Sequence, residues 1–367
     1  MTTIQLLTPL SEIHQAAGAK MTDFAGWKMP LQYSGVLEEH EAVRTHGGVF
    51  DLSHMAEIVV TGEERELFIQ EMVTNDLAKL KPGQAMYSCL CDEKGGIIDD
   101  LLVYRFPEEL WIVANASNRA AVTAWLDRHA SGRDVSLDDR TEQIALIAVQ
   151  GPNAERILAP HAGESVAQID FYTAQWGEVA GCPALISRTG YTGEDGFELY
   201  LENAYAEKVW RALLDGDDKL VPVGLAARDT LRLESGFALY GNELNAERSP
   251  YDVSLGWVVK LETEPKPMVA SALSSRKDSA HTCIVGLSME GRTVPRAGYE
   301  VHHKGQSVGV VTSGTFSPTL KKGVALAMVE RSVRAEGTEL EVIVRGKPQS
   351  AQVAKLPFVR GSVKRHS

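Results

Sequence analysis

The sequence has few cysteines and no long apolar run, and both absences exclude classes of protein. Four of the 367 residues are cysteine, and Cys89 and Cys91 lie two positions apart, so they would share one face of a strand. That spacing disfavours a mutual disulfide, and paired C-x-x-C zinc motifs are missing, so we expect reduced, structural cysteines. No apolar stretch approaches the roughly 20 residues of a membrane span, and the N-terminus lacks a signal-peptide pattern. We therefore expect a cytoplasmic protein, or the mature form of an imported one, without a membrane partner.

Common cofactor and catalytic motifs are missing as well. The chain contains no G-x-G-x-x-G after a strand, no G-x-x-x-x-G-K-[ST], no H-E-x-x-H and no G-x-S-x-G. Dinucleotide, P-loop, zincin and α/β-hydrolase functions therefore lose their usual support. His302 and His303 are adjacent and would point to opposite faces of a strand, so we expect no metal site.

Charge is unevenly distributed along the chain. The net charge of −12 argues against nucleic acid as a partner. Residues 281–367 carry 13 Lys and Arg against 6 Asp and Glu, or +7, whereas residues 1–280 carry 24 against 43, or −19. The basic segment is either a solvated surface or one that receives an anionic ligand or an acidic partner.

The apolar spacing predicts an α+β chain. Helical spacing occurs near residues 8–18, 36–46, 63–74, 117–130, 152–161, 204–214 and from Leu225 onward. Strand-like runs lie between these helices without regular βαβ order, and Gly95-Gly96 predicts a hairpin that joins residues 85–92 to 97–106. Residues 262–277 are rich in Pro, Ser and charge and predict a linker. The short strands that follow indicate a small β-barrel or sandwich.

Two adjacent acids lie in the strand-like run KGGIIDDLLVY. Strand alternation places Asp99 with Leu101 and Val103, and Asp100 with Leu102 and Tyr104. Asp is depleted in strands, and a buried carboxylate needs partners. The pair is either solvated near the hairpin end or held in a pocket, where a carboxylate could bind or polarise an N–H group.

Two further stretches contain candidate site residues. RTGYTGEDGFE offers glycines for close backbone approach, an aromatic face at Tyr191 and an acceptor at Glu198, although such a pattern is also that of a plain turn. The run ARDTLRLE places Arg228 on a helix with Asp229, Arg232 and Glu234, which alone predicts an internal ion-pair network with an Arg fork available for a carboxylate.

Taken together, these stretches resemble one family. The motifs DFAGWKMPLQY, EHEAVRTHGGVFDLSHM, GGIIDDLLVY, AVQGP, SRTGYTGEDGFELY, ARDTLRLE, LYGNEL and TSGTFSPTL occur in order over nearly the whole chain. This series is similar to the T-protein of the glycine cleavage system, a tetrahydrofolate-dependent aminomethyltransferase. The resemblance implies a three-domain cloverleaf, with two antiparallel-sheet α+β domains in the folate-binding region 1–265, a linker at 266–280 and a C-terminal β-barrel at 281–367.

The resemblance also implies a reaction and a site. Tetrahydrofolate, or its polyglutamates, would be the co-substrate, lipoylated H-protein the partner, and no metal would be needed. Asp100 corresponds to the catalytic acid, and an arginine of the tail, Arg365 or failing that Arg360, to the partner of the folate glutamate. The folate-contacting positions implied by the resemblance are Met55, Tyr87, Leu102, Tyr104, Asn115, Tyr172, Tyr191, Glu198, Arg228, Trp257 and Arg365.

Departures from the family pattern leave two alternatives open. The usual D-F-I-G-K-x-A-L before the barrel is replaced at residues 265–273, which puts the linker in doubt but not the folate pocket. A sister folate enzyme that demethylates or methylates a small substrate would have a similar pocket. A folate-binding iron–sulfur assembly factor would carry K-G-C-x-x-G-Q-E, and Ala238 replaces that cysteine here.

Overall fold

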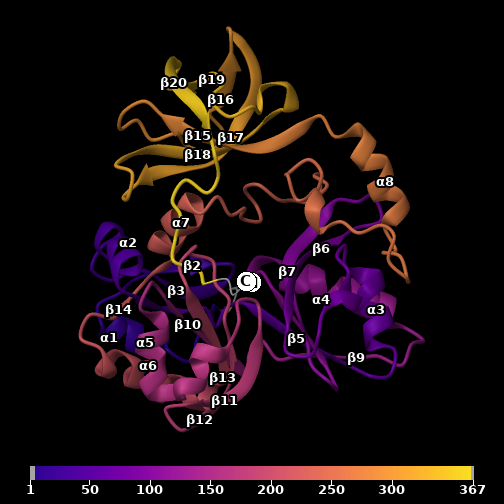
Figure 1. Ribbon diagram of the computed structural model, residues 1–367, viewed down its shortest axis with the longest axis vertical. Coiled ribbons are helices and arrows are strands. Elements are labelled where there is room, and N and C mark those ends of the chain that lie inside the picture. Colours follow the sequence, from indigo (N-terminus) through magenta and orange to yellow (C-terminus); the bar gives the residue numbers. More distant parts are fainter. Residues whose placement is uncertain (1–4, 365–367) are drawn as a thin grey trace.

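The computed structural model describes residues 5–364 and contains three open sheets and one closed barrel. Figure 1 shows two bodies of sheet and helix side by side, with the barrel above them and helix α7 (Leu225–Glu234) between the barrel and the body on the left. This arrangement confirms the expected α+β class with a C-terminal β-barrel. Within the described residues, no helix is long and apolar enough to cross a membrane.

The first body is built on an antiparallel five-stranded sheet of order β6-β7-β8-β5-β9. Its strands are β5 (Ala56–Thr61), β6 (Ala85–Cys91), β7 (Ile97–Arg105), β8 (Leu110–Ala114) and β9 (Ser136–Asp139). Helices α3 (Arg65–Met72) and α4 (Arg119–Ala130) and the short turns η1 (Leu77–Lys79) and η2 (Ala116–Asn118) accompany it. Apolar side chains such as Leu101 and Val103 pack against Phe68 and Leu126 of these helices. The predicted hairpin is present as β6–β7, with Tyr87 opposite Leu102.

The second body is a six-stranded sheet of order β11-β12-β13-β10-β4-β14. Its strands are β4 (Gly48–Asp51), β10 (Ile144–Gln150), β11 (Ala174–Val179), β12 (Cys182–Ser187), β13 (Gly196–Glu202) and β14 (Val221–Pro222). One face packs on α5 (Ala154–Ala162) and α6 (Asn203–Gly216). The smaller sheet β1 (Leu6–Leu7), β2 (Lys20–Phe24) and β3 (Trp27–Gln32), the turn η3 (Glu164–Gln168) and the helices α1 (Ser11–Ala16) and α2 (Val36–Thr45) complete this part.

The two large sheets turn their remaining faces toward one another. A central apolar cluster joins Val59 and Trp111 of the first sheet to Leu146, Leu185 and Tyr200 of the second. Because directly paired residues point to the same face, the register places Tyr87, Leu102, Val113 and Glu57 in one row toward this centre. Strand pairing aligns Glu198 with Ala148 on the opposing sheet. Tyr87 and Glu57 of the first sheet and Glu198 of the second therefore face the space between the two bodies.

The chain between α7 and the barrel contains regular secondary structure. It contains the short turn η4 (Gly256–Val258) and helix α8 (Ala270–Ser279). Leu273 of α8 is fully buried against a cluster that includes Cys89 and Ile97 of the hairpin. The segment 262–277, expected to be a linker, thus contains most of α8, because one buried leucine anchors a helix within a polar sequence.

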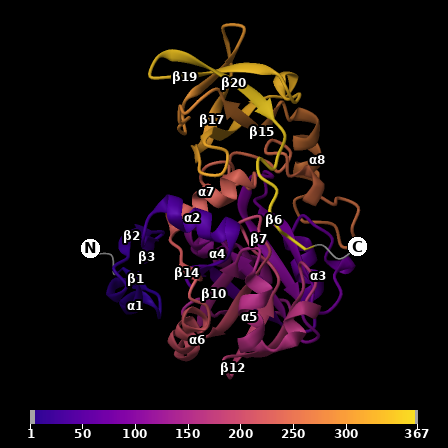
Figure 2. The same ribbon diagram turned by 60° about the vertical axis from the view of Figure 1, so that its left-hand side comes forward.

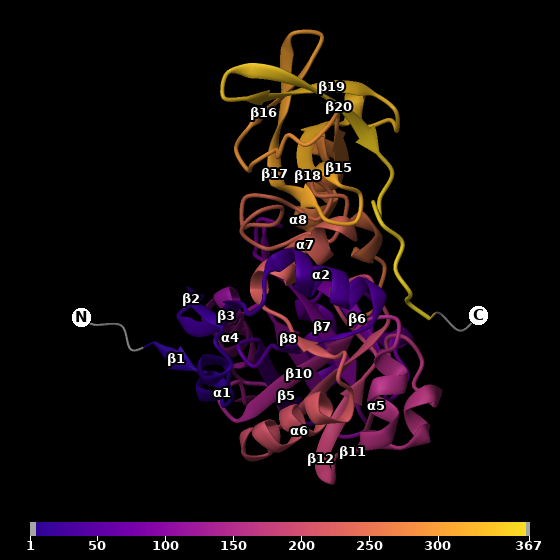
Figure 3. The ribbon, with the colours of Figure 1, turned by 90° about the vertical axis from the view of Figure 1, so that its left-hand side faces the viewer.

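The barrel closes in the order β15-β18-β17-β16-β19-β20. Its strands are β15 (Thr282–Met289), β16 (Glu300–His303), β17 (Gln306–Ser317), β18 (Lys322–Glu330), β19 (Glu339–Val344) and β20 (Lys347–Ala354), and η5 (Arg331–Val333) follows β18. In Figures 2 and 3 the barrel lies directly above α7, and the chain after β20 descends beside that helix. Arg232 of α7 donates to Ser313 of β17 at 2.8 Å, and Glu234 accepts a hydrogen bond from Ser317 at 2.5 Å.

Other sequence expectations differ from the structure only in detail. The helix expected from Ser117 begins at Arg119, because Ser117 lies in the turn η2 and Asn118 occupies the N-cap position. The first helix is shorter than expected, at Ser11–Ala16. All four cysteines are free and buried, as expected for reduced, structural residues.

Candidate active site

Asp100 and Asp99 point to opposite faces of β7, as strand alternation predicts. Asp99 is fully buried on the side of α4, where it accepts hydrogen bonds from Asn118 Nδ2 at 2.6 Å and from the Asn115 backbone N–H at 2.9 Å. Asp100 lies on the face of Leu102 and Tyr104, toward the space between the sheets. Neither acid is a solvated turn residue, since both side chains are hydrogen-bonded within the fold.

Two side chains hold the Asp100 carboxyl group. Tyr87 donates its hydroxyl to Oδ2 at 2.9 Å, and Asn115 Nδ2 lies 2.9 Å from Oδ1. The Tyr87 ring in turn stacks on Trp257 of η4, with centroids 6.0 Å apart and planes at 22°. Trp257 is 60% exposed, so this aromatic pair forms an accessible wall beside the carboxyl group.

The two acids form a coupled pair that shares Asn115. Asn115 Nδ2 also lies 2.7 Å from Asp99 Oδ1, so one amide group reaches both carboxyls. Burial, followed by the charge of Asp100, raises the pKa of Asp99 to about 8. Burial also raises the pKa of Asp100, and the hydrogen bonds from Tyr87 and Asn115 oppose that rise. Burial thus favours the neutral form of both carboxyl groups, while the hydrogen bonds that each accepts favour its charged form.

Glu198 faces this site from the opposing sheet. It is buried on β13, and Thr189 donates its hydroxyl to Oε2. Burial raises the pKa of Glu198, while the Thr189 hydrogen bond and the charge of Arg228 oppose the rise. Tyr104 is fully buried, and its hydroxyl contacts Thr189 Oγ1 at 3.3 Å and Ser187 Oγ at 3.0 Å. Tyr104 thus contacts Thr189, the residue whose hydroxyl donates to Glu198.

Arg228 is the unpaired cation of the site. Among residues 5–364 its guanidinium has no hydrogen-bond or ion-pair partner, although it lies over the Tyr191 ring at 4.9 Å. Burial lowers the pKa of Arg228, and the charge of Glu198 opposes that shift. By contrast, Arg232 is saturated by Asp229 and Glu243, so the ion-pair network predicted for this helix leaves Arg228 free for a ligand.

The remaining predicted residues lie at the edge of the same space. Met55, Leu102 and Tyr172 are partly buried against the central cluster. Tyr191 stacks on Phe237 with centroids 5.5 Å apart and donates its hydroxyl to the carbonyl of Ala238. Arg365 lies outside the described residues, and Arg360 is exposed.

Sequence reasoning missed two buried groups near the site. Within residues 5–364, His54 Nδ1 has no hydrogen-bond partner, and burial followed by the charge of Arg228 lowers the pKa of His54 to about 4. Both carboxyl oxygens of Glu57 likewise lack a hydrogen-bond partner in the described part of the chain, and burial raises the pKa of Glu57. His54 could have been suspected from its place beside Met55 in the DLSHM motif. No local pattern indicates that Glu57 points inward, because that follows from the register of β5.

The arrangement can bind a flat, polar molecule with an anionic end. Asp100 and Glu198 offer carboxyl groups from two facing sheets, Tyr87, Trp257 and Tyr191 offer aromatic surfaces, and Arg228 offers a free guanidinium. Carboxyl groups held in place before the reaction can bind N–H donors and stabilise positive charge as it develops. No cluster of three or more potential metal ligands occurs in the part of the chain that the structure describes.

Comparison with known proteins places this chain in a family. Residues 10–263 match the model of the GCVT N-terminal domain, and residues 283–360 match that of the glycine cleavage T-protein C-terminal barrel domain. The chain belongs to the glycine cleavage T-protein family. This confirms the resemblance seen in the sequence motifs.

Relatives of known name extend over nearly the full length. Proteins named aminomethyltransferase from Desulfitobacterium hafniense and Thermotoga neapolitana are 45% and 46% identical to the chain, which covers 98% and 99% of their lengths. In both cases at least 96% of this chain is aligned. The crystal structure of the glycine cleavage system aminomethyltransferase T from Bartonella henselae superimposes with a TM-score of 0.91 at 39% identity, covering 98% of this chain and 99% of that one. The T-protein function and the aminomethyltransferase class expected from the sequence are thereby confirmed.

Proposed function

We propose that this T-protein family member transfers the one-carbon unit of an aminomethyl group, carried on the lipoyl arm of H-protein, to tetrahydrofolate. In this reaction the C–S bond to the lipoyl sulfur breaks and the sulfur takes up a proton. The methylene carbon becomes bonded to N5 and N10 of the folate, which lose their protons, and the amino nitrogen leaves as ammonia. The products are 5,10-methylenetetrahydrofolate, ammonia and dihydrolipoyl H-protein.

The single observation that supports this proposal best is the position of Asp100 opposite Glu198. The two carboxyl groups approach from separate sheets, and the aromatic wall of Tyr87 and Trp257 lies beside the first of them. A pterin ring between the sheets would donate its exocyclic amino group to Glu198. Its N5 and N10 would then lie near Asp100, whose carboxyl group is held by Tyr87 and Asn115.

Asp100 would stabilise positive charge on the transferred carbon and would not attack it as a nucleophile. As the C–S bond breaks, the transferred carbon gains iminium character, and a fixed carboxylate in a poorly hydrated site stabilises that positive charge. The same carboxylate can accept the proton that N10 loses when the ring closes. Arg228, which has no partner within the described residues, would neutralise the carboxylate of the folate glutamate.

The decisive experiment combines a binding and a turnover measurement. The protein is titrated with tetrahydrofolate, and ammonia release from aminomethylated H-protein is then followed with and without the folate. We expect saturable folate binding and folate-dependent ammonia release in equal amounts with 5,10-methylenetetrahydrofolate. Turnover of small methylated amines, with none of aminomethylated H-protein, would instead identify a sister demethylase and contradict the proposal.

A further inference from the structure

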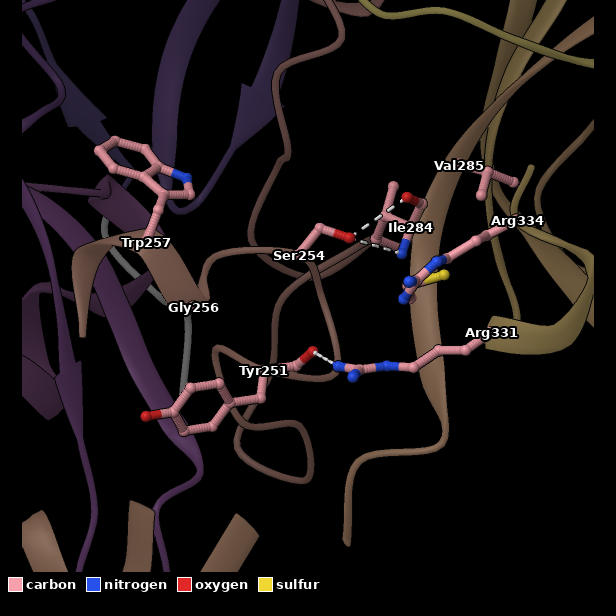
Figure 4. Close-up of a pocket in the computed structure, with 9 residues that line it drawn as sticks. Tyr251, Ser254, Gly256, Trp257, Ile284, Val285, Arg331 and Arg334 are labelled. Atoms are coloured by element: carbon pink, nitrogen blue, oxygen red, sulfur yellow. Dashed lines mark hydrogen bonds between the residues drawn. The ribbon is translucent and has the colours of Figure 1, made fainter. Parts of the chain in front are cut away.

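The barrel meets the rest of the chain at two places, and the first is the segment that precedes η4. There Arg331 of η5 donates to the carbonyl of Tyr251 at 2.7 Å, as Figure 4 shows. The N–H of Ile284 on β15 donates to Ser254 Oγ at 3.2 Å. A cavity of about 410 Å³ lies between the two sides, lined in part by these four residues and by Arg334. This contact is therefore only partly filled, and its hydrogen bonds end on a segment outside the two large sheets.

The second place is the C-terminal tail, residues 355–364, which follows β20. Leu356 packs in one apolar cluster with Leu233 of α7. At the far end of the tail, Lys364 donates to Glu155 of α5 at 2.9 Å. Figure 3 shows this course, in which the chain runs down from the barrel and past α7. The tail therefore connects the barrel to the second body.

Ser362 is the point at which the tail contacts the loop between β12 and β13. Its N–H and its hydroxyl both donate to Oε2 of Glu194, at 2.9 and 2.6 Å. The N–H of Asp195 donates back to Ser362 Oγ at 3.1 Å. Next to this serine, a Cβ on Gly361 would collide with the carbonyl oxygen of Gly193, so the two backbones lie in direct contact. The tail therefore holds three consecutive residues of the β12–β13 loop.

Glu194 is held from its other side as well. Arg44 of α2 donates to Oε1 at 2.7 Å and to the carbonyl of Thr192 at 2.8 Å. Glu194 is 7% exposed, so its charge depends on these partners rather than on water. Removing the Ser362 hydroxyl would leave Oε2 with a single backbone donor, and we expect the loop to move until that oxygen is hydrated.

The β12–β13 loop carries Tyr191, whose ring is part of the candidate active site. The Arg228 guanidinium lies over this ring at 4.9 Å, and Phe237 stacks on it with centroids 5.5 Å apart. Tyr191 and Glu194 belong to the same short loop, so a displacement at Glu194 would move the surface on which Arg228 rests. A continuous series of bonds and contacts therefore leads from Ser362 through Glu194 and Tyr191 to Arg228.

We propose that the C-terminal tail positions the folate end of the site, with Ser362 as a positioning residue that acts through Glu194 and the β12–β13 loop. This role rests on folate binding at Arg228, as proposed above. A tail that only fastened the barrel would need its contacts with α7 and α5, but not a bond to the loop that carries Tyr191. Ser362 would touch neither folate nor the transferred carbon, so it would affect the affinity for folate rather than the transfer step.

The test compares two serines that make the same kind of contact. The N–H and the hydroxyl of Ser249, between α7 and η4, both donate to Oδ2 of Asp252, at 2.9 and 2.7 Å, so Ser249→Ala removes an equivalent hydroxyl from another segment. The kcat and the KM for tetrahydrofolate, with aminomethylated H-protein at saturation, are measured for the native protein, Ser362→Ala, Ser362→Thr and Ser249→Ala. Amide hydrogen exchange of the β12–β13 loop is measured on the same four proteins without folate.

We expect Ser362→Ala to raise the KM for tetrahydrofolate roughly fivefold, the scale of one net hydrogen bond, with kcat changed by less than about twofold. Its loop amides should exchange faster, whereas Ser362→Thr and Ser249→Ala should keep the native KM and the native exchange. An equal rise in KM in Ser249→Ala, or a fall in kcat without a rise in KM, would overturn the proposal. So would a native KM or native loop exchange in Ser362→Ala. If ammonia release by the native protein did not depend on folate while Ser362→Ala still exchanged faster, the proposed function would fail, and the tail would hold the loop without positioning folate.

Discussion

Tyr87 and Asp100 are joined by a hydrogen bond of 2.9 Å across the strand pair β6–β7, from the phenol to Oδ2 of the carboxyl. This bond stabilises the ionised carboxylate and so opposes the rise that burial causes in the pKa of Asp100. Removing the donor should therefore make Asp100 harder to ionise. The hydrogen bond from Tyr87 to Asp100 should therefore influence the pH range over which the protein is active.

Tyr87→Phe should move the acid limb of the kcat/KM profile to higher pH. The expected displacement is about 1–2 pH units, because one hydrogen bond to a charged group is lost. Initial rates of ammonia release between pH 5 and 9 provide the measurement. Tyr240→Phe is the matched control, since that hydroxyl donates to the carbonyl of Ile97 and not to Asp100. An acid limb that stays in place, or moves to lower pH, would show that Tyr87 does not tune the acid.

Glu198→Gln should weaken folate binding more than it slows turnover at saturation. The buried carboxyl accepts from Thr189 and remains available to a pterin amino group, so its loss removes a charge-assisted bond worth about 1.5–3 kcal/mol, or 10-fold to 150-fold in Kd. Calorimetric titration with 5-formyltetrahydrofolate checks this. Glu202→Gln, at the exposed end of the same strand, should leave Kd unchanged. Native affinity in Glu198→Gln would remove this residue from the pterin site.

Glu234→Gln should loosen the contact between α7 and the barrel. Burial disfavours the charged carboxylate, but His40, Ser317 and Arg44 lower the pKa of Glu234 to about 2. Breaking such a buried ion pair costs about 3–5 kcal/mol of unfolding free energy. Urea unfolding monitored by circular dichroism should show this loss, and the exposed control Glu330→Gln should not.

The pH dependence of that loss follows from the direction of the shift. Because the folded-state pKa lies below the usual 4.5, the stabilisation is present above pH 4.5 and disappears as the pH falls through about 2. The native protein and Glu234→Gln should therefore converge in stability over this interval. A difference that is constant with pH would show that the ionisation of Glu234 is not the cause.

His54→Asn should reduce the decrease in unfolding free energy that the native protein shows as the pH falls from 6.5 to 4. Burial and the nearby Arg228 keep His54 neutral, with a pKa of about 4 against the usual 6.5. The unfolded chain thus takes up a proton that the folded chain excludes, and the native fold loses up to about 3 kcal/mol as the pH falls through this window. His281→Asn, at an exposed position, should retain the native slope. Parallel curves for His54→Asn and the native protein would contradict this.

Local patterns in the sequence predicted much of this structure. Alternation along KGGIIDDLLVY correctly placed Asp100 with Leu102 and Tyr104, because a strand turns successive side chains to opposite faces whatever its partners. The Gly95-Gly96 hairpin and the strands of the barrel were predicted for the same local reason. Each feature depends on backbone geometry within a few residues.

Features that depend on distant parts of the chain could not be predicted in this way. Asn118 bonds to Asp99 only because β7 lies beside β8 and the start of α4, and Glu57 points inward only through the register of β5. Helix α8 forms in a polar segment because Leu273 finds a buried position against the hairpin. The cavity at Arg334 exists because the segment after α7 meets the barrel, which no motif records.

The most direct test of the proposed mechanism is the rate of ammonia release by Asp100→Asn. Asparagine keeps the size of the side chain and can still accept from Tyr87, so the fold and the Kd for folate should stay close to native. Without the carboxylate, turnover of aminomethylated H-protein should fall by at least about 100-fold, the usual scale for a general acid–base or charge-stabilising group. Asp100→Asn that binds folate and releases ammonia at the native rate would contradict the central claim.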